Sequence, residues 1–263
     1  PLAHSFARVM EMAFIRMGVP TALDADNDNL FANLQAVKPT FFASVPRLFE
    51  VAYAHLVSET LSSSKLNRHL LHWGIDLGRR VSNHSQQGQE PNFGLKVPFA
   101  LAEKLIFKKI NDQFGGDLRF IISGGAPLSS QLAQFFHACG VLILEGYGLT
   151  ETSAATCVNR VDDFAFGTVG KPLPGTQIKI SDENEVLIQG PGVTTGYHNL
   201  PDHTAKLFTE DGWLRTGDLG KLDARGNLVL TGRIKDLIIT SGGKNIAPAH
   251  FERMLMEHSP FVS

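Results

Sequence analysis

Cysteine is nearly absent from this 263-residue chain, which carries only Cys139 and Cys157. Two cysteines provide neither a disulfide framework nor the paired spacing of a zinc site, so reduced, buried thiols are expected, as in a cytosolic protein. Long hydrophobic runs are lacking too, since no uninterrupted apolar stretch reaches the roughly 18 residues of a membrane-spanning helix. The pattern therefore argues against a disulfide-rich scaffold and against a spanning helix in this sequence.

An excess of charge of one sign is also missing. The formal net charge is −2, which gives no global signature of nucleic-acid binding or of attraction to an anionic membrane. The 43% hydrophobic and 19% charged residues are those of an ordinary globular protein. The length favours two or three packed units. Because the chain opens on Pro1 rather than methionine, we expect it to be a piece of a longer protein.

The first half of the sequence alternates predicted strands and helices. Phe41–Pro46 is typical of a buried strand, and a long helical region, about 47–114, follows it, with a surface loop expected at 82–94. Two strand–turn–helix units come next, with their strands at 118–122 and 141–144. Such alternation predicts a parallel sheet, in which ligands bind at the carboxyl ends of the strands.

After about Asn159 the pattern changes to short apolar runs separated by glycine and proline turns, which indicates an all-β subdomain. The expected organisation is an α/β subdomain at 1–158 with adenine-binding strand ends, and a β-rich subdomain at 159–232. A hinge with the truncated start of a small C-terminal domain is expected at 233–263.

Glycines at two adjacent strand ends are the first candidate site. Gly124–Gly125 and Gly146 lie where a flat ring could approach bare backbone. Tyr147 could stack on that ring, and Thr150 could donate its hydroxyl to a phosphate. Glu151 is a hard oxygen ligand suited to Mg²⁺ beside such a phosphate. The alternative is that these glycines only shape the turns between strands and helices.

Two further segments carry candidate nucleotide contacts. In Trp213–Gly220, Asp218 stands between glycine turns and could accept hydrogen bonds from both hydroxyls of a ribose; an Asx turn is the alternative. In Gly232–Asp236, Arg233 and Lys235 would point the same way on a strand and could face a phosphate or ribose. A solvated basic face is the alternative there.

Taken together, these segments resemble the adenylate-forming superfamily of acyl-CoA synthetases, luciferases and peptide-synthetase adenylation domains. The shared motifs are the core Tyr147–Glu151, the ribose motif Trp213–Gly220, the hinge motif Gly232–Asp236 and the β-subdomain signature Gly190–Val193 with Gly196–Tyr197. Finer features resemble the branch of long-chain fatty acyl-CoA synthetases. These features are the segments Pro1–Arg8, Ser44–Glu50 and Ser241–Pro248, with a long helical insertion after the second.

The resemblance implies an α/β fold, namely the second half of the family's large N-terminal domain and the start of its small C-terminal domain. That half consists of a parallel α/β sheet and a β-barrel-like subdomain. The resemblance implies adenine contacts from Gly124, Gly125, Ala126, Gly146, Tyr147 and Gly148. It implies contacts with the ribose and phosphates from Thr150, Asp218, Arg233 and Lys235, Mg²⁺ binding by Glu151, and His4 near the reacting carboxylate. Asp236 would be the hinge, and Gly242 and Gly243 would approach coenzyme A.

The implied activity is that of an AMP-forming long-chain fatty acid–CoA ligase. A fatty carboxylate attacks the α-phosphate of ATP, and the thiol of coenzyme A then displaces AMP from the acyl-adenylate. The substrates would be fatty acid, ATP and coenzyme A, with Mg²⁺ and without nucleic acid. A cytoplasmic location is expected, and peripheral contact with the inner face of a membrane stays open.

The sequence also departs from the family pattern. The phosphate loop expected upstream of Pro1 and the catalytic lysine expected near the end of the last domain are not present, so we expect this piece to bind AMP weakly and not to turn over. Asn184 replaces the glycine usual before Glu185, and asparagine tolerates a left-handed turn. Two alternatives remain: an adenylating enzyme that passes the acyl group to a carrier protein, and a nucleotide-binding module without catalysis.

Overall fold

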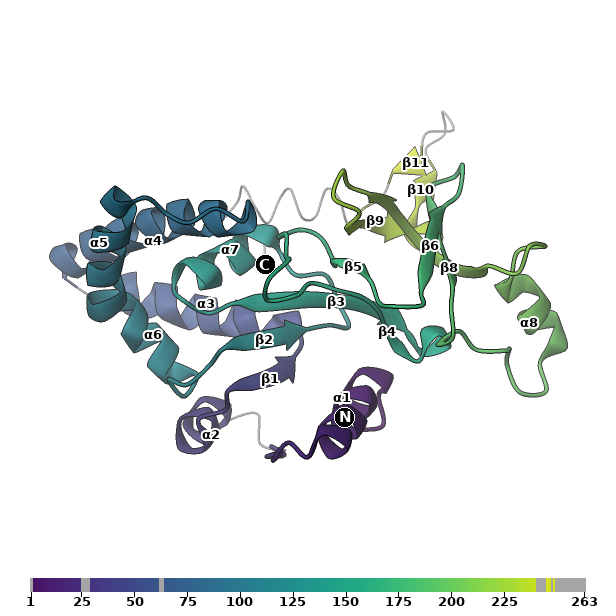
Figure 1. The fold of residues 1–263 in the computed structure, drawn as a ribbon, viewed down its shortest axis with the longest axis horizontal. Helices are drawn as coiled ribbons and strands as arrows, with labels where there is room; N and C mark the ends of the chain where they lie inside the picture. The colour runs from purple at the N-terminus through teal and green to yellow at the C-terminus, as the bar shows by residue number, and fades with distance from the viewer. Residues whose placement is uncertain (1, 25–28, 62–63, 240–244, 247, 249–263) are drawn as a thin grey trace. The chain divides into compact units, whose positions relative to one another are not determined.

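The computed structural model describes residues 2–24, 29–61, 64–239, 245, 246 and 248, which divide into two compact units (Figure 1). A helical unit comprises 10–145 and 161–166. A β-rich unit comprises 2–9, 146–160 and the described residues from 167 onward. The three-part division expected from the sequence, with boundaries after 158 and 232, stays a prediction.

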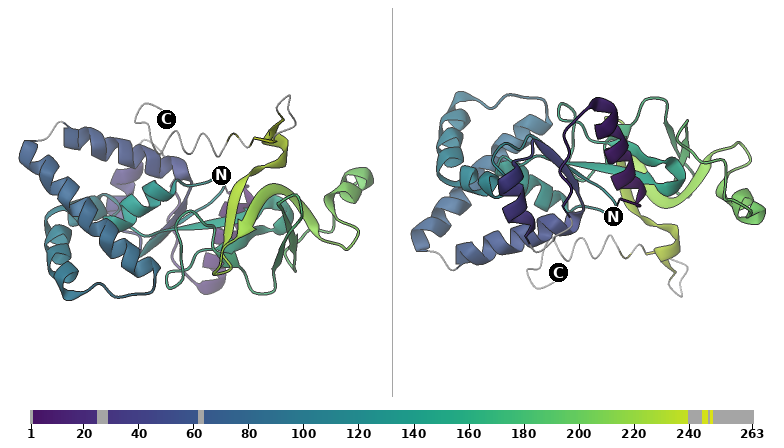
Figure 2. Two further views of the ribbon diagram at one scale, coloured as in Figure 1. Left: turned by 90° about the horizontal axis from the view of Figure 1, so that it is seen from above. Right: turned by 90° about the horizontal axis from the view of Figure 1, so that it is seen from below.

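The helical unit is built on three parallel strands. Strand β1 (Phe41–Ser44) pairs with β2 (Phe120–Ser123), which pairs with the first half of β3 (Ile143–Leu149). This confirms the parallel sheet expected from the sequence. The helices of the unit, seen from above and below in Figure 2, are α2 (Leu30–Val37), α3 (Pro46–Leu61), α4 (Lys65–Gln86), α5 (Phe93–Ala102), the π-helix η1 (Glu103–Phe107), α6 (Lys108–Gln113) and α7 (Ser130–Ala138). Helix α1 (Ser5–Met17) begins in the β-rich unit and ends in this one.

Local sequence explains where these helices begin. Pro46 opens α3, because proline lacks the N–H that a first helical residue leaves unpaired. The Ser64 side chain accepts a hydrogen bond from the backbone N–H of Asn67 (3.3 Å) and caps α4. Asn92 caps α5 in the same way. Such caps stabilise a helix by about 1 kcal/mol each.

The predicted surface loop at 82–94 is wrong over its first part, since α4 continues through Gln86 and only 87–92 is non-helical. The reason lies in Ser82, which is 1% exposed and whose hydroxyl is 2.7 Å from Nδ1 of His137 on α7. Serine is typical of loops, but Ser82 can be buried between two helices because its hydroxyl has a hydrogen-bond partner there.

Aromatic side chains form the core of the helical unit. Phe49, Phe114 and Phe136 are each 0% exposed, and the ring of Phe136 meets the other two edge to face. Helices α4 and α7 approach closely at Gly78, where a Cβ would lie 2.3 Å from the backbone oxygen of Ala138. Each buried aromatic side chain contributes on the order of 2–3 kcal/mol of hydrophobic stabilisation, so these rings contribute much of the stability of the unit.

The β-rich unit contains an antiparallel sheet in the order β6 (Gln177–Ile180), β7 (Glu185–Gln189), β8 (Leu214–Leu222) and β9 (Leu228–Arg233). The end of β3 pairs antiparallel with β4 (Ala154–Val158), which pairs with β5 (Lys171–Pro172). The remaining elements are η2 (Thr150–Thr152), α8 (Pro201–Leu207), η3 (Ile234–Asp236), β10 (Ile238–Ile239) and β11 (Asn245–Ile246).

The core of this unit is aliphatic, with Val186, Ile188, Leu214 and Leu228 each at most 1% exposed. The strands predicted after Asn159 are confirmed. The α/β fold class is confirmed too, with a sheet that contains both parallel and antiparallel strand pairs. Among the described helices, none is both long and apolar enough to cross a bilayer.

Candidate functional site

The turn after β3 carries Thr150 and Glu151 on its outer side. Pairing between β3 and β4 shifts register between Tyr147 and Gly148. A Cβ on Gly148 would lie 1.3 Å from the backbone oxygen of Ala154, so only glycine fits there. Ala154 itself has φ 82°, a strained value for a residue with a side chain. The surrounding structure therefore holds this turn in one unusual conformation.

Thr152 fixes the turn from inside. Its Oγ1 accepts a hydrogen bond from the backbone N–H of Leu149 (2.9 Å) and another from the hydroxyl of Thr156 (2.9 Å). Thr152 and Thr156 are 4% and 1% exposed. With the buried polar atoms satisfied, Thr150 is left exposed and Glu151 partly exposed, in position to meet a ligand.

Asp218 unites three segments that are far apart in the sequence. Tyr147 donates its hydroxyl to Oδ2 of Asp218 (2.6 Å), and Nε of Arg233 lies 2.9 Å from Oδ1. Asp218 is 4% exposed, and Arg233 is its register partner across β8 and β9. Burial, together with the charge of Asp218, raises the pKa of Tyr147, which keeps that phenol protonated as a donor. The structure thus brings Tyr147, Asp218 and Arg233 together.

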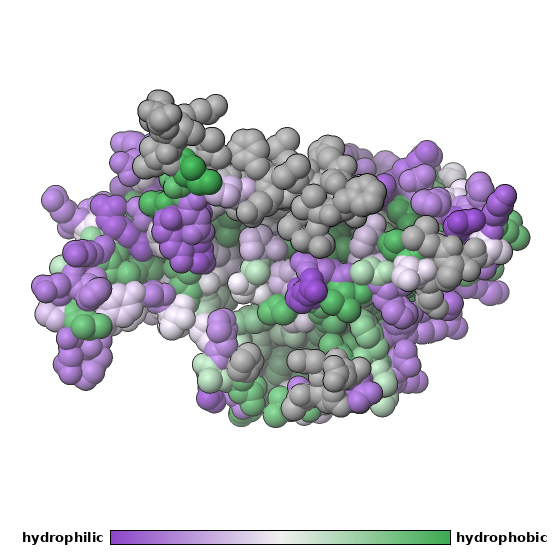
Figure 3. All heavy atoms as spheres, turned by 180° about the vertical axis from the view of Figure 1, so that it is seen from behind, coloured by the Kyte–Doolittle hydropathy of each residue, from purple (hydrophilic) through white to green (hydrophobic). Residues whose placement is uncertain are grey.

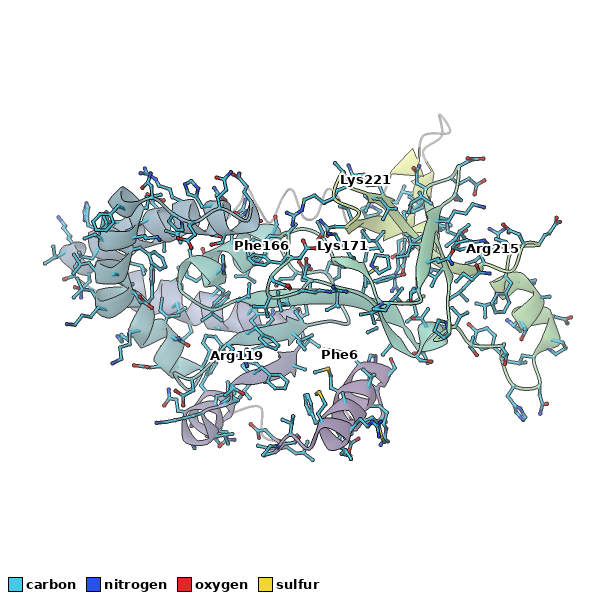
Figure 4. The ribbon with its side chains drawn as sticks, in the orientation of Figure 1. Phe6, Arg119, Phe166, Lys171, Arg215 and Lys221 are labelled. Atoms are coloured by element: carbon cyan, nitrogen blue, oxygen red, sulfur yellow. The ribbon has the colours of Figure 1, made fainter. Side chains whose placement is uncertain are left out.

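Glu185 holds the backbone next to Asp218 and was not predicted as a site residue. Its Oε1 accepts a hydrogen bond from the backbone N–H of Gly217 (3.0 Å), and its Oε2 is 3.1 Å from Arg215, which is labelled in Figure 4. The hydroxyl of Thr216 donates to the backbone oxygen of Val186 (2.7 Å) and accepts from the N–H of Asp218 (3.0 Å). An acidic residue at the head of the apolar run 186–188 was the available signal, because a buried charge requires partners.

Glu151 is held by Tyr197, the second residue that the sequence did not identify as part of the site. Tyr197 donates its hydroxyl to Oε1 of Glu151 (2.7 Å), and this hydrogen bond raises the pKa of Tyr197. The described part of the chain contains no group of three or more His, Cys, Asp or Glu side chains that could hold a metal by itself. One partly exposed carboxylate fits Mg²⁺, which proteins commonly bind through one or two carboxylates together with the phosphates of a substrate.

The glycines predicted to contact adenine are divided between the two units. Gly124 and Gly125 follow β2 in the helical unit, where the N–H of Gly124 donates to the backbone oxygen of Ser44 (3.2 Å) and Gly125 has φ 84°. Ala126 next to them is exposed. Gly146 and Gly148 belong to the β-rich unit. Gly124 and Gly125 follow the end of β2 as expected, whereas Gly146 and Gly148 lie within β3, which continues to Leu149. The strand end predicted at 144 is therefore wrong, because β3 goes on to pair with β4.

The remaining predicted residues stand on other elements than Tyr147, Asp218 and Arg233. His4 is exposed, and its Nδ1 accepts a hydrogen bond from the N–H of Phe6 (3.3 Å) at the start of α1. The strand expected over 232–236 ends at Arg233, and Lys235 and Asp236 are exposed in the 3-10 turn η3. The prediction that Arg233 and Lys235 share a strand face is therefore wrong, because the chain turns between them. Gly242 and Gly243 lie outside the described residues.

The two cysteines are buried and free, as predicted. Burial raises the pKa of both thiols to about 12, so neither forms a thiolate at neutral pH. Neither cysteine is therefore a candidate nucleophile.

Comparison with known proteins identifies the family of this chain. The family model described as AMP-binding enzyme matches residues 1–198. The chain is 38% identical over its whole length to the long-chain-fatty-acid–CoA ligase FadD15 of Mycobacterium tuberculosis, of which it spans 43%. It is 34% identical to the long-chain-fatty-acid–CoA ligase heimdall of Drosophila melanogaster and spans 40% of that protein. The chain thus spans less than half the length of these relatives.

Solved structures show the same fold. ATP-bound MatB from Rhodopseudomonas palustris superposes with a TM-score of 0.66 at 25% identity, covering 99% of this chain and 44% of the other. The o-succinylbenzoate CoA synthetase MenE from Bacillus subtilis, in complex with its acyl-adenylate intermediate, gives a TM-score of 0.67 at 24% identity. That match covers 98% of this chain and 44% of the other.

Proposed function

We propose, on the premise that this chain belongs to the AMP-binding enzyme family, that the protein containing it activates a long-chain fatty acid with ATP and passes the acyl group to coenzyme A. The observation that carries the proposal is the carboxylate of Asp218, buried and held between Tyr147 and Arg233. Three of the motifs that resemble the adenylate-forming family meet at this one group. The relatives named as long-chain-fatty-acid–CoA ligases support the choice of acid and acceptor.

The proposed reaction has two steps. An oxygen of the fatty carboxylate attacks the α-phosphorus of ATP, the bond to the bridging oxygen breaks, and pyrophosphate leaves. The thiol of coenzyme A then attacks the acyl carbon of the mixed anhydride, AMP leaves, and the thiol loses its proton. The protein catalyses such phosphoryl chemistry mainly by positioning and by balancing charge.

On the ribose side, Asp218 is proposed to accept hydrogen bonds from the two hydroxyls. A carboxylate has about four acceptor positions, and the contacts with Tyr147 and Arg233 engage one on each oxygen. One position on each oxygen remains for a ribose hydroxyl. Lys235 is proposed to assist from the neighbouring turn. The adenine would contact the backbone of Gly124, Gly125, Ala126, Gly146 and Gly148 and the ring of Tyr147.

On the phosphate side, Thr150 is proposed to donate its hydroxyl to the α-phosphate, and His4 to lie near the reacting carboxylate. Glu151 would hold Mg²⁺, which when bound offsets the negative charge of the phosphates. Oε1 of Glu151 accepts a hydrogen bond from the hydroxyl of Tyr197. Asp236 is proposed as the hinge between the two half-reactions, and Gly242–Gly243 as the segment that approaches coenzyme A.

The test is pyrophosphate release by the full-length protein with ATP, Mg²⁺ and palmitate, followed by acyl-CoA formation. We expect release to require all three compounds, and a short-chain acid such as acetate to be a poor substitute. No acid-dependent release at any chain length, with AMP still bound, would favour a nucleotide-binding module. Transfer to the pantetheine of a carrier protein but not to free coenzyme A would favour the alternative acceptor.

Peripheral contact with a membrane is a second proposal, and it concerns the helical unit. Apolar residues reach the protein surface among hydrophilic ones (Figure 3). Phe93, Val97 and Leu101 of α5 stand four residues apart, hence on one helix face, and are 80%, 58% and 53% exposed. The exposed Lys104 of η1 and the exposed Lys108 at the start of α6 follow α5 in the chain. Apolar side chains with lysines beside them are typical of helices that lie in an anionic membrane surface.

The membrane proposal has a direct test. The full-length protein should co-sediment with vesicles that contain phosphatidylglycerol, and a double substitution, Val97→Ser with Leu101→Ser, should reduce the bound fraction. Equal binding by the two proteins would overturn this proposal and leave the ligase proposal unaffected.

A further inference from the structure

The loop Gly190–Tyr197 braces the turn that carries Glu151, and both segments belong to the β-rich unit. Ser153 donates its hydroxyl to the backbone oxygen of Gly192 (2.8 Å). The N–H of Thr194 donates to the backbone oxygen of Glu151 (2.8 Å). The third contact is the hydrogen bond from the Tyr197 hydroxyl to Oε1 of Glu151 (2.7 Å). The loop therefore holds both the main chain and the side chain of this residue.

Two glycines allow the loop to come this close. A Cβ on Gly192 would lie 2.9 Å from the backbone oxygen of Thr152, so a larger residue would push the loop away from the turn. At Gly196 a Cβ would lie 2.4 Å from Cγ2 of Thr204, and its φ of 145° is one that other residues rarely adopt. The glycines thus place the Tyr197 backbone beside α8.

Helix α8 anchors the tyrosine at its main chain. The N–H of Tyr197 donates to Oγ1 of Thr204 (2.9 Å), and the hydroxyl of Thr204 donates in turn to the backbone oxygen of Leu200 (3.0 Å). Tyr197 is 40% exposed, so packing alone leaves its ring some freedom. Its two hydrogen bonds, one at each end of the residue, restrict that freedom.

We propose that Tyr197 is a positioning residue, which holds one oxygen of Glu151 so that the other oxygen is directed toward a divalent cation bound with ATP. The inference rests on the proposed function. No hydrogen-bond donor among the described residues meets Oε2 of Glu151. Glutamate loses much side-chain entropy when it is ordered, and a short hydrogen bond from a phenol to a carboxylate orders it before the cation arrives.

Tyr197→Phe in the full-length protein tests this role, because it removes only the hydroxyl. The free Mg²⁺ concentration for half-maximal pyrophosphate release, at saturating ATP and palmitate, should rise about tenfold, which is about 1.4 kcal/mol. The kcat at saturating Mg²⁺ should change little. Binding of Mn²⁺ with a non-hydrolysable ATP analogue, followed by electron paramagnetic resonance, should weaken by a similar factor and needs no turnover.

Tyr53→Phe is the matched control. Tyr53 is also 40% exposed and lies on α3 in the helical unit, where its ring meets that of Phe135. It should leave the Mg²⁺ requirement unchanged. A wild-type protein that neither releases pyrophosphate nor binds the cation with the nucleotide contradicts the proposed function itself.

With an active wild type, three results overturn the role of Tyr197. The first is an unchanged Mg²⁺ requirement in Tyr197→Phe. The second is a lower requirement, which would mean that the phenol competes with the cation. The third is a lower kcat and melting temperature with the same Mg²⁺ requirement, which would mean that the hydroxyl only stabilises the fold.

Discussion

The helical unit and the β-rich unit bury different kinds of side chain. Of the ten buried polar or charged residues in the described chain, three belong to the helical unit: Ser82, Ser123 and Glu145. Seven belong to the β-rich unit: Thr152, Thr156, Asn159, Thr168, Glu185, Asp218 and Asn227. The helical unit instead buries phenylalanine rings. A buried polar group costs free energy unless it is paired, so the β-rich unit depends more on its hydrogen-bond networks than the helical unit does.

We infer from this difference that stability and ligand chemistry depend on different sets of residues in this chain. Asp218 and Glu185 are each held by a buried network, and a change there should alter nucleotide binding. A change in the aromatic core should alter stability alone.

Phe136→Ala should cause the largest loss of stability, about 4 kcal/mol, because it leaves a cavity in a core where Phe136 is 0% exposed. Hydrogen exchange of α7 in the full-length protein should accelerate by a corresponding factor, while AMP affinity of the folded protein stays the same. Phe93→Ala, at an 80% exposed position, is the control and should change little. If AMP affinity falls together with stability, the aromatic core contributes to nucleotide binding as well, and the proposed division between the two units is wrong.

Asp218→Asn should affect AMP affinity more than stability. We expect AMP affinity to fall about 100-fold, or about 2.7 kcal/mol, because the charge-assisted hydrogen bonds are lost while the shape is kept. Calorimetric titration with AMP measures the fall. Asp182→Asn, at an exposed position in the same unit, is the control. An undiminished affinity in Asp218→Asn would remove the main support for the ribose site.

The sequence predicted the fold class and the strands of both units because periodicity and glycine turns are local signals. Gly148 and Asp218 stand in contiguous motifs and could be identified in the same way. The apolar run after Glu185 indicates that this residue is buried, but it does not indicate the partner, because Gly217 is 32 residues away. Tyr197 could not be identified from the sequence, because Glu151 is 46 residues away and nothing local indicates that pairing. The turn after Arg233 was missed for a similar reason, since a period-two pattern does not reveal where a strand ends.

His137 should make the helical unit sensitive to acid. Burial lowers the pKa of His137 from 6.5 to about 4, and the ring lies against Phe164 and Phe166 (Phe166 is labelled in Figure 4). A lowered pKa means that the unfolded chain binds the proton first. The stability that the neutral imidazole contributes is therefore complete above pH 6.5 and is lost as the pH falls toward 4. At pH 5 the loss in the free energy of unfolding is about 2 kcal/mol.

The matched variant for this prediction is His137→Gln, which keeps a hydrogen-bonding group opposite Ser82 and does not titrate. Urea unfolding of the helical unit, followed by hydrogen exchange of α7 at pH 7.5 and pH 5, should show a smaller loss of stability in the variant. Equal losses in the variant and the wild type would assign the acid sensitivity to other groups.

Asn184 provides the smallest test and concerns the β-rich unit. Its φ is 64°, which confirms the left-handed turn expected from the sequence, and its backbone oxygen accepts a hydrogen bond from the N–H of Gly220 (2.9 Å). Asn184→Ala should cost about 1 kcal/mol, because a β-carbon is strained in this conformation, whereas Asn184→Gly should cost less. Hydrogen exchange of β7 measures both. If Asn184→Ala also weakens AMP binding, the turn before Glu185 transmits its geometry to Asp218, and the site extends further into this sheet than its direct contacts.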